Sequence, residues 1–242
     1  MAPWAAWLVV GGAAFVHGLA GFGSALFAMP LLALYLDLRT VSPAVALMGL
    51  TLNLVLLWQL RGRVAWRHLP PVLAGALAGV PVGVGILREW PVAWLKAVLG
   101  VVLVAYGAWR LRRRPTPGAG DRPWPAALLG FAAGCLGGAF NTSGPPVILW
   151  AGRQPWPKDT VKATLQAFFL VLSAGVVAGH AWAGLIDARV TAFYLSTLPA
   201  LLAGLALGAF LYRRVTTEGY RDLLHLALVG LGLLSLWSAR GG

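Results

Sequence analysis

The chain has 242 residues, of which 59% are hydrophobic and only 11% are charged, and its mean hydropathy is +0.78. Soluble domains carry about 25% charged residues, so this composition excludes an ordinary soluble protein. In a soluble protein the net charge of +12 would suggest nucleic acid, but Lys and Arg collect in the cytoplasmic loops of membrane proteins, so we expect no nucleic-acid partner.

Apolar segments long enough to cross a bilayer, about 20 residues each, follow one another along the chain. They cover residues 4–36, 42–60, 69–87, 91–109, 124–151, 160–184, 190–211 and 222–238. No stretch remains for a soluble domain, so the sequence predicts an all-α polytopic protein in a lipid bilayer. Two ladders of small residues are typical of close helix packing: Gly75, Gly79 and Gly83, and Ala200, Gly204 and Gly208.

Two Gly-rich interruptions divide the chain into halves. GLAGFGSALFAMPLL (18–32) aligns without a gap, at an offset of 116 residues, with GCLGGAFNTSGPPVIL (134–149), so that Pro30 falls on Pro146. Each copy is followed by three further apolar segments. This pattern predicts a first transmembrane repeat at 1–110, a basic cytoplasmic linker at 111–123 and a second repeat at 124–242.

The first and fifth segments are too long for one straight crossing. Residues 4–36 would make a helix of about 50 Å, whereas the hydrocarbon core is about 30 Å thick. The two segments either cross as tilted, broken helices or re-enter as hairpins. Crossing would divide the 19 basic residues as 10 and 9, whereas hairpins would place 14 on one side and five on the other. The positive-inside rule favours hairpins, and three crossings per half would then invert the second repeat, as in secondary transporters.

The interruptions themselves predict a site for a small anion. Irregular backbone at membrane depth occurs only inside protein or beside a watery cavity. A helix that restarts there directs free N–H groups and its positive dipole end at that cavity. Ser, Thr and Asn are good N-cap residues, and Pro suits a first turn. We expect the restarting helices near Gly23, Ser24 and Ala25, and around Asn141, Thr142, Ser143 and Gly144, followed by Pro145 and Pro146.

Further polar residues lie inside the apolar segments. His17 precedes the first interruption and could titrate or donate to a substrate, or instead bind a carbonyl group in the bundle. Asn53 and Gln166 could line the site or join helices by hydrogen bonds. No segment has an acidic residue at its centre, and neither a phosphate-binding loop nor metal-ligand spacing occurs. We therefore expect no metal, no cofactor and no catalytic residue.

The motifs GFGSALFAMPLL (21–32) and GGAFNTSGPPVILW (137–150), each opening a half, resemble the sulfite exporter TauE/SafE family, also called the toluene sulfonate uptake permease family. The resemblance implies a secondary transporter of a prokaryotic inner membrane for a small sulfur-containing anion, such as sulfite or an organosulfonate. It marks Gly21, Gly23, Ser24 and Pro30, and Gly137, Gly138, Asn141, Thr142, Ser143, Gly144, Pro145 and Pro146.

The sequence leaves open the direction of transport and whether transport is coupled to another ion. Export of an anion from a negative-inside cell is downhill in potential, whereas uptake would need a coupling ion, for which H⁺ through His17 is the candidate. The sequence also leaves open a homo-oligomer, an uptake carrier for a different small anion, and a membrane-embedded binding or assembly protein that transports nothing.

Overall fold

A computed structural model describes residues 3–91, 93–95, 97–98, 100–101, 104–105, 123–151, 153–212 and 233. All secondary structure in these ranges is helical, and the all-α prediction is confirmed. Among the described helices, five are long and apolar enough to cross a membrane: Leu38–Arg63, Trp66–Glu89, Pro123–Phe140, Thr160–Trp182 and Ala188–Tyr212. The expected segment 91–109 is described only in part. Residues 111–122 of the expected linker and, apart from residue 233, the segment 222–238 lie outside the described residues.

The two over-long segments are each divided into a long and a short helix. These are α1 (Pro3–Ala20) and α2 (Ser24–Leu32), and α6 (Pro123–Phe140) and α7 (Gly144–Ala151). The other described segments form α3 (Leu38–Leu60), α4 (Leu69–Glu89), α8 (Lys158–Trp182) and α9 (Ala188–Tyr212). The short 3-10 helices η1 (Arg61–Arg63) and η2 (Trp66–His68) connect α3 to α4. The breaks expected in both motifs are therefore present.

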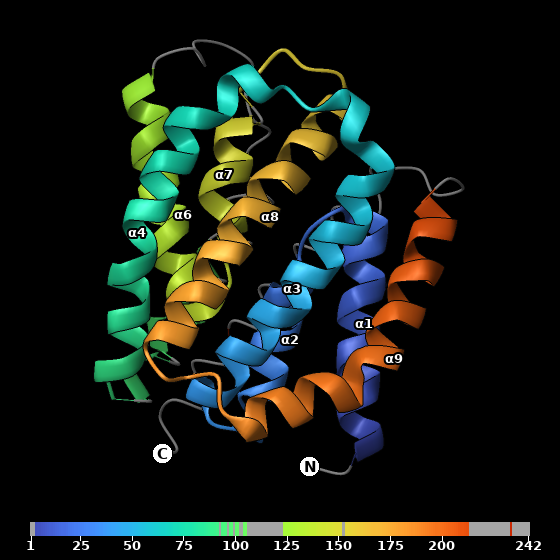
Figure 1. Cartoon of the computed structure of the whole chain (residues 1–242), viewed down its shortest axis with the longest axis vertical. Coiled ribbons are helices and arrows are strands. Elements are labelled where there is room, and N and C mark those ends of the chain that lie inside the picture. The colour runs from blue at the N-terminus through green and yellow to red at the C-terminus, as the bar shows by residue number, and fades with distance from the viewer. Residues whose placement is uncertain are drawn as a thin grey trace.

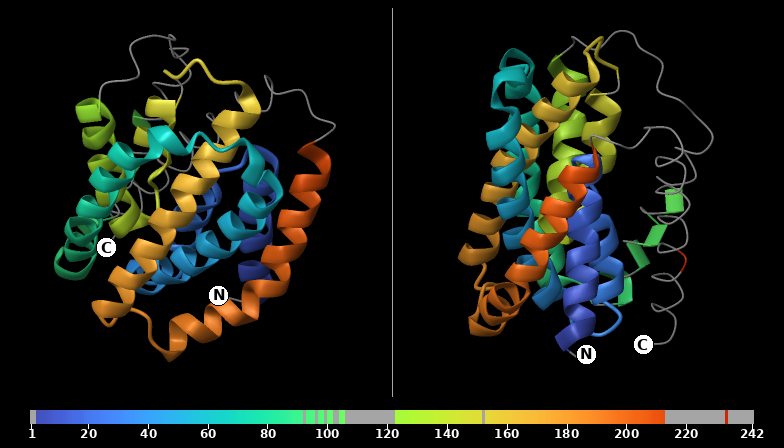
Figure 2. Two further views of the ribbon diagram at one scale, coloured as in Figure 1. Left: turned by 45° about the horizontal axis from the view of Figure 1, so that its top comes forward. Right: turned by 90° about the vertical axis from the view of Figure 1, so that its right-hand side faces the viewer.

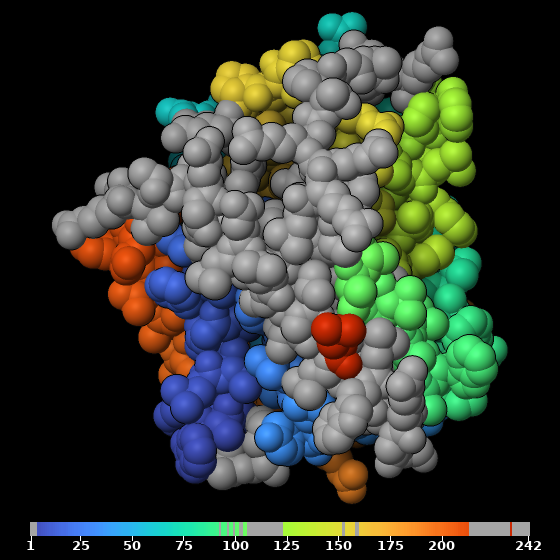
Figure 3. Space-filling view, turned by 180° about the vertical axis from the view of Figure 1, so that it is seen from behind, coloured from blue at the N-terminus to red at the C-terminus, as the bar shows by residue number. Residues whose placement is uncertain are grey.

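The helices form three neighbouring pairs. α3 packs on α8 at the centre, with the pair α4 and α6 on one side and the pair α1 and α9 on the other (Figure 1). A second direction also shows α1 beside α9 (Figure 2), and from behind α1 and α6 occupy opposite flanks (Figure 3). Each pair thus joins one helix from residues 1–110 to one from residues 124–242. The division into two repeats stays a prediction. In the packing, α4 of the first half lies against α6 of the second half, and α9 of the second half lies against α1 of the first.

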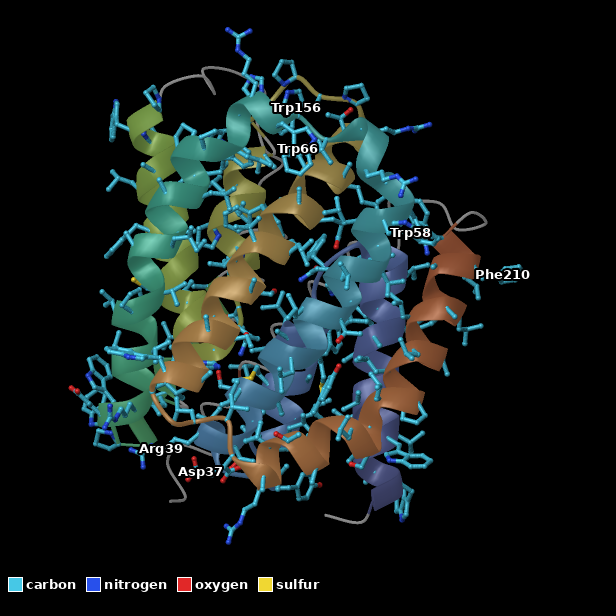
Figure 4. All side chains as sticks on the ribbon, in the orientation of Figure 1. Asp37, Arg39, Trp58, Trp66, Trp156 and Phe210 are labelled. Atoms are coloured by element: carbon cyan, nitrogen blue, oxygen red, sulfur yellow. The ribbon has the colours of Figure 1, made fainter. Side chains whose placement is uncertain are left out.

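The short helices α2 and α7 turn back along the helices that precede them. α1 runs from the end of the molecule marked N into its interior, and α2 returns toward that end (Figure 1). Asp37 and Arg39, at the start of α3, lie at the same end, whereas Trp58, Trp66 and Trp156 lie at the opposite end (Figure 4). The pair α6 and α7 enters from the Trp156 end. The two hairpins therefore approach each other from opposite ends.

Glycines allow the outer pairs to pack backbone to backbone. Lipid tails are as apolar as side chains, so membrane helices associate through close van der Waals contact at small residues. A carbonyl oxygen of the partner helix occupies the place of an added Cβ at Gly75, Gly79, Gly83, Gly130, Gly134, Gly204 and Gly208. The packing role expected for both ladders is confirmed. At Gly79 this oxygen belongs to Phe131, and at Gly204 it belongs to Gly11, which lies 120 residues before Phe131.

We expect a matched pair of glycine variants on α4 to differ in stability. Gly85→Ala adds a Cβ with no atom within 4 Å, and Ala is about 1 kcal/mol more favourable than Gly in a helix interior, so its melting temperature should stay or rise. Gly79→Ala must push α4 away from α6, and overpacking of this kind costs about 1–3 kcal/mol. Thermal unfolding in detergent measures both, and equal melting temperatures would contradict the close packing.

Candidate functional site

One cavity lies where the two helix breaks meet α3 and α8. Its volume of about 50 Å³ exceeds the roughly 10–15 Å³ that one water needs, so it holds more than one water-sized group. The expected site residues in its wall are His17, Gly23, Ser24, Ala25, Asn53, Asn141, Thr142, Ser143 and Gly144. The structure therefore brings together residues that are more than 100 positions apart in the sequence.

The first break exposes the start of α2 to the cavity. Gly21 and Gly23 have φ angles of 80° and 98°, in the left-handed region that favours glycine. The Gly21 N–H donates to the carbonyl of His17 at 2.6 Å and ends α1. α2 begins at Ser24, so the first-turn N–H groups of Ser24 and Ala25 have no acceptor within the helix. Both residues line the cavity, which places these N–H groups where a ligand can accept from them.

His17 connects the two helices of the first hairpin and is almost fully buried, with 4% of its surface exposed. Its Nδ1 lies 2.9 Å from the hydroxyl of Ser24 rather than against a backbone carbonyl. When the hydroxyl donates to Nδ1, the proton of the imidazole is on Nε2. Among the described residues Nε2 makes no hydrogen bond of regular geometry, although the side chains of Asn53 and Gln166 lie near the ring. The Nε2–H is thus a donor suited to a ligand in the cavity.

The second break depends on the side chain of Asn141. This residue has a φ of 54°, in the left-handed region that Asn tolerates better than most residues, and its N–H donates to the carbonyl of Gly137 at 2.8 Å. Its Nδ2 donates to the carbonyl and hydroxyl oxygens of Ser42 on α3, at 2.6 and 3.0 Å. The Ser42 hydroxyl donates in turn to the carbonyl of Ala139 at 2.9 Å. The amide of Asn141 therefore holds the break in place.

The second break offers hydroxyl groups more than backbone amides. Pro145 and Pro146 lie in the first turn of α7, as expected, and neither has an N–H. Thr142 is 1% exposed, and its Oγ1 has no hydrogen-bond partner among the described residues. Ser143 is also buried in the cavity wall. The two breaks therefore present different donors, mainly backbone N–H groups from the first and hydroxyls from the second.

Asn53 and Ser173 join α3 to α8 across the cavity. The Nδ2 of Asn53 donates to the Ser173 hydroxyl at 3.1 Å, and the described residues provide no partner for the buried Oδ1 of Asn53. Ser173 was not expected at the site. It lies 120 residues after Asn53, and the same interval separates Gly21 from Asn141. An offset of 120 residues, about one helical turn more than the 116 of the sequence alignment, leads from Asn53 to Ser173.

Charge and metal-binding capacity also constrain the site. Among the described residues, no acidic side chain is part of the cavity wall. In the part of the chain that the structure describes, no group of three or more His, Cys, Asp or Glu residues is placed to hold a metal ion. The polar wall thus consists of neutral hydrogen-bonding groups and helix starts, an arrangement that favours a small anion.

Comparison with known proteins identifies the family of the chain. The profile described as Sulfite exporter TauE/SafE matches residues 6–235. The chain belongs to this family. TauE/SafE proteins are membrane transporters, so the chain is a transporter and not an enzyme. The probable sulfite/organosulfonate exporter TauE of Cupriavidus necator is 28% identical over 199 residues, which cover 80% of this chain and 77% of that protein. No solved structure matches the chain.

Some residues expected at the site of this TauE/SafE protein lie beside the cavity rather than in its wall. Gln166 donates from Nε2 to the Gly21 carbonyl, so it supports the first break. The Gly138 carbonyl accepts from Nε2 of His180 on α8, at 2.8 Å. Pro30 was expected to break a helix, but it lies inside α2, because the break precedes α2 at residues 21–23.

The left-handed backbone at Asn141 predicts that two substitutions of this residue differ in thermal stability. Asn141→Gly and Asn141→Ala both lose the bonds to Ser42, but only Ala is strained at this φ, by about 1–2 kcal/mol. We expect Asn141→Ala to unfold at a lower temperature than Asn141→Gly in detergent, although Ala is the better helix former. The reverse order would contradict the left-handed conformation.

Proposed function

We propose that this TauE/SafE protein is a secondary transporter that binds a small sulfur oxyanion, such as sulfite or an organosulfonate, in the cavity between its two helix breaks. The observation that carries the proposal is that His17 and Thr142 line one cavity from the two helix breaks, and that the buried atoms His17 Nε2 and Thr142 Oγ1 make no regular hydrogen bond within the described residues. The name of the Cupriavidus necator relative supports sulfite and organosulfonates as the substrate class.

An oxyanion fits these groups because each of its oxygens accepts hydrogen bonds. The N–H groups of Ser24 and Ala25 and the positive dipole end of α2 would bind one side of the ligand. The hydroxyl of Thr142 would bind the other side, and Nε2–H of His17 would donate between them. Hydrogen bonds to a charged ligand are stronger than neutral ones, and the low dielectric of the cavity increases this advantage.

Alternating access would follow from hairpins that enter the membrane from opposite sides. In this proposal α1–α2 and α6–α7 are re-entrant and the repeats are inverted, with the substrate at their interface. The loops near Trp58, Trp66 and Trp156 contain Arg61, Arg63, Arg67 and Arg153. The positive-inside rule then makes this end cytoplasmic, in the inner membrane of a prokaryotic cell.

Export is the direction that the membrane potential favours. One negative charge that leaves a cell with a potential of 100 mV, negative inside, gains about 2.3 kcal/mol, so an exporter needs no coupling ion. Uptake by the same cavity would need a coupled cation. His17 is the described titratable residue in the cavity wall, so H⁺ would be that cation.

Anion flux into proteoliposomes tests the site. We expect Thr142→Val to lower kcat/KM for sulfite about tenfold, because a hydrogen bond to a charged group contributes roughly 1.5–3 kcal/mol. Val has nearly the shape of Thr, and the Thr142 hydroxyl makes no described hydrogen bond that folding would lose. Radiolabelled or fluorimetric sulfite flux, together with thiosulfate, sulfate, sulfoacetate and taurine, measures the effect and the substrate range.

Thr197→Val is the matched control. Thr197 is 1% exposed, and its hydroxyl bonds only to carbonyls of its own helix, at Phe193 and Tyr194. Its flux should equal that of the unsubstituted protein. Equal flux in Thr142→Val and Thr197→Val would reject the proposed site. Absence of flux for every tested anion in the unsubstituted protein would favour a binding protein that does not transport.

Cysteine labelling tests the re-entrant topology. After Cys135→Ala, single cysteines are introduced by Asp37→Cys, Arg63→Cys, Arg153→Cys or Asp187→Cys, and intact cells are treated with a membrane-impermeant maleimide. Re-entrant hairpins place positions 63 and 153 together in the cytoplasm, protected until the membrane is opened, and leave 37 and 187 reactive from outside. Labelling of 63 and 153 from opposite sides would show that α1–α2 and α6–α7 cross instead.

A further inference from the structure

A lysine lies beside the first helix break, at the end of the molecule that carries Trp58, Trp66 and Trp156. Lys162 belongs to the second turn of α8, which begins at that end (Figures 1 and 4). Its Cε and Cγ carbons lie against Gly21, where an added Cβ would meet them. Its Nζ lies 3.3 Å from the centre of the Tyr212 ring, a cation–π contact between α8 and the last turn of α9. The ammonium group is therefore fixed next to the break.

The position of Lys162 places its charge close to the cavity wall. Gln166, one turn further along α8, donates to the Gly21 carbonyl, so both residues flank the same break. The Gly21 N–H is bonded to the carbonyl of His17, which lines the cavity. An anion that approaches the first break from this end passes near the ammonium group.

The corresponding position at the second break carries no charge. The interval of 120 residues that relates Gly21 to Asn141 relates Lys162 to Ser42. Ser42 is fully buried and lies beside Asn141, as Lys162 lies beside Gly21. At these two matched positions of the described chain, a lysine therefore lies beside the first break and an uncharged serine beside the second.

We propose that Lys162 recruits the anion to the cavity from the basic end of the molecule and makes that end the side on which substrate is loaded. This inference rests on the proposed transport of a sulfur oxyanion. A cation in a cleft of low dielectric raises the local concentration of an anion and partly replaces its hydration. Because Ser42 offers no such attraction at the opposite end, binding from the two sides is unequal, and loading from the basic end is favoured.

Sulfite transport measured from each face separately tests this inference. Right-side-out and inside-out vesicles are prepared with the unsubstituted protein, Lys162→Gln and Lys162→Arg. We expect Lys162→Gln to raise the KM for sulfite about tenfold from the basic face, within the range of electrostatic steering, and to remove most of its dependence on ionic strength. KM from the opposite face should change less than about twofold. Lys162→Arg keeps the charge and should retain the KM of the unsubstituted protein.

Arg153→Gln is the charge-matched control, because it removes one positive charge from an exposed loop at the same end. Its KM should stay unchanged on both faces. If Lys162→Gln does not accumulate in the membrane, Lys162→Met, which keeps the aliphatic contact with Gly21, replaces it. An unchanged KM, or an equal rise on both faces, would overturn the recruiting role of Lys162. Failure of the proposed function looks different, since the unsubstituted protein would then show no sulfite flux from either face.

Discussion

Hydrogen bonding of the interrupted backbone is the constraint on which the rest of this structure depends. Non-helical backbone at membrane depth is stable only when its polar groups find partners within the protein or beside water. At the first break Gln166 of α8 donates to the Gly21 carbonyl, and at the second Asn141 donates to Ser42 of α3. The central helices α3 and α8 therefore hold both breaks in place. The donors of the breaks that form no hydrogen bond within the protein, such as the first-turn N–H groups of α2, belong to residues of the cavity wall.

The packing of the outer helices separates rigid from adjustable parts of the molecule. Backbone contacts at Gly79 and Gly204 hold α4 to α6 and α9 to α1, with no side chain between them that could change rotamer. α3 and α8 instead meet through side chains, among them the bond from Asn53 to Ser173. In the proposed transport cycle, movement at this central contact would change access to the cavity more readily than separation of either outer pair.

The sequence predicts the positions of the helix breaks well, because each break is marked by residues within it. It predicts less well which residues of the two halves correspond, because this depends on the exact offset between them. Glycines at 21 and 23 and the run Asn141 to Pro146 locate both breaks, because they interrupt apolar segments that are otherwise continuous. The offset of 116 residues rests on matches of single glycines and prolines, whereas Gly21 and Asn141, the left-handed residues of the two breaks, are 120 residues apart, about one helical turn more. At 116 residues Asn53 falls on Phe169, so the alignment did not lead to Ser173, whose side chain is common in packed membrane helices and gives no signal alone.

In the proposed function, the Asn53–Ser173 pair would let one cavity accept both sulfite and organosulfonates. As the structure has it, Nδ2 donates to Ser173 and Oδ1 makes no regular hydrogen bond within the described residues, an arrangement that suits the hydroxyl proton of a hydrogen sulfite ion. A half-turn of the amide would let the Ser173 hydroxyl donate to Oδ1 and would direct Nδ2 at the ligand, as a fully deprotonated sulfonate requires. A hydroxyl partner permits this exchange because it both donates and accepts, whereas a backbone carbonyl in its place would fix the amide in one orientation.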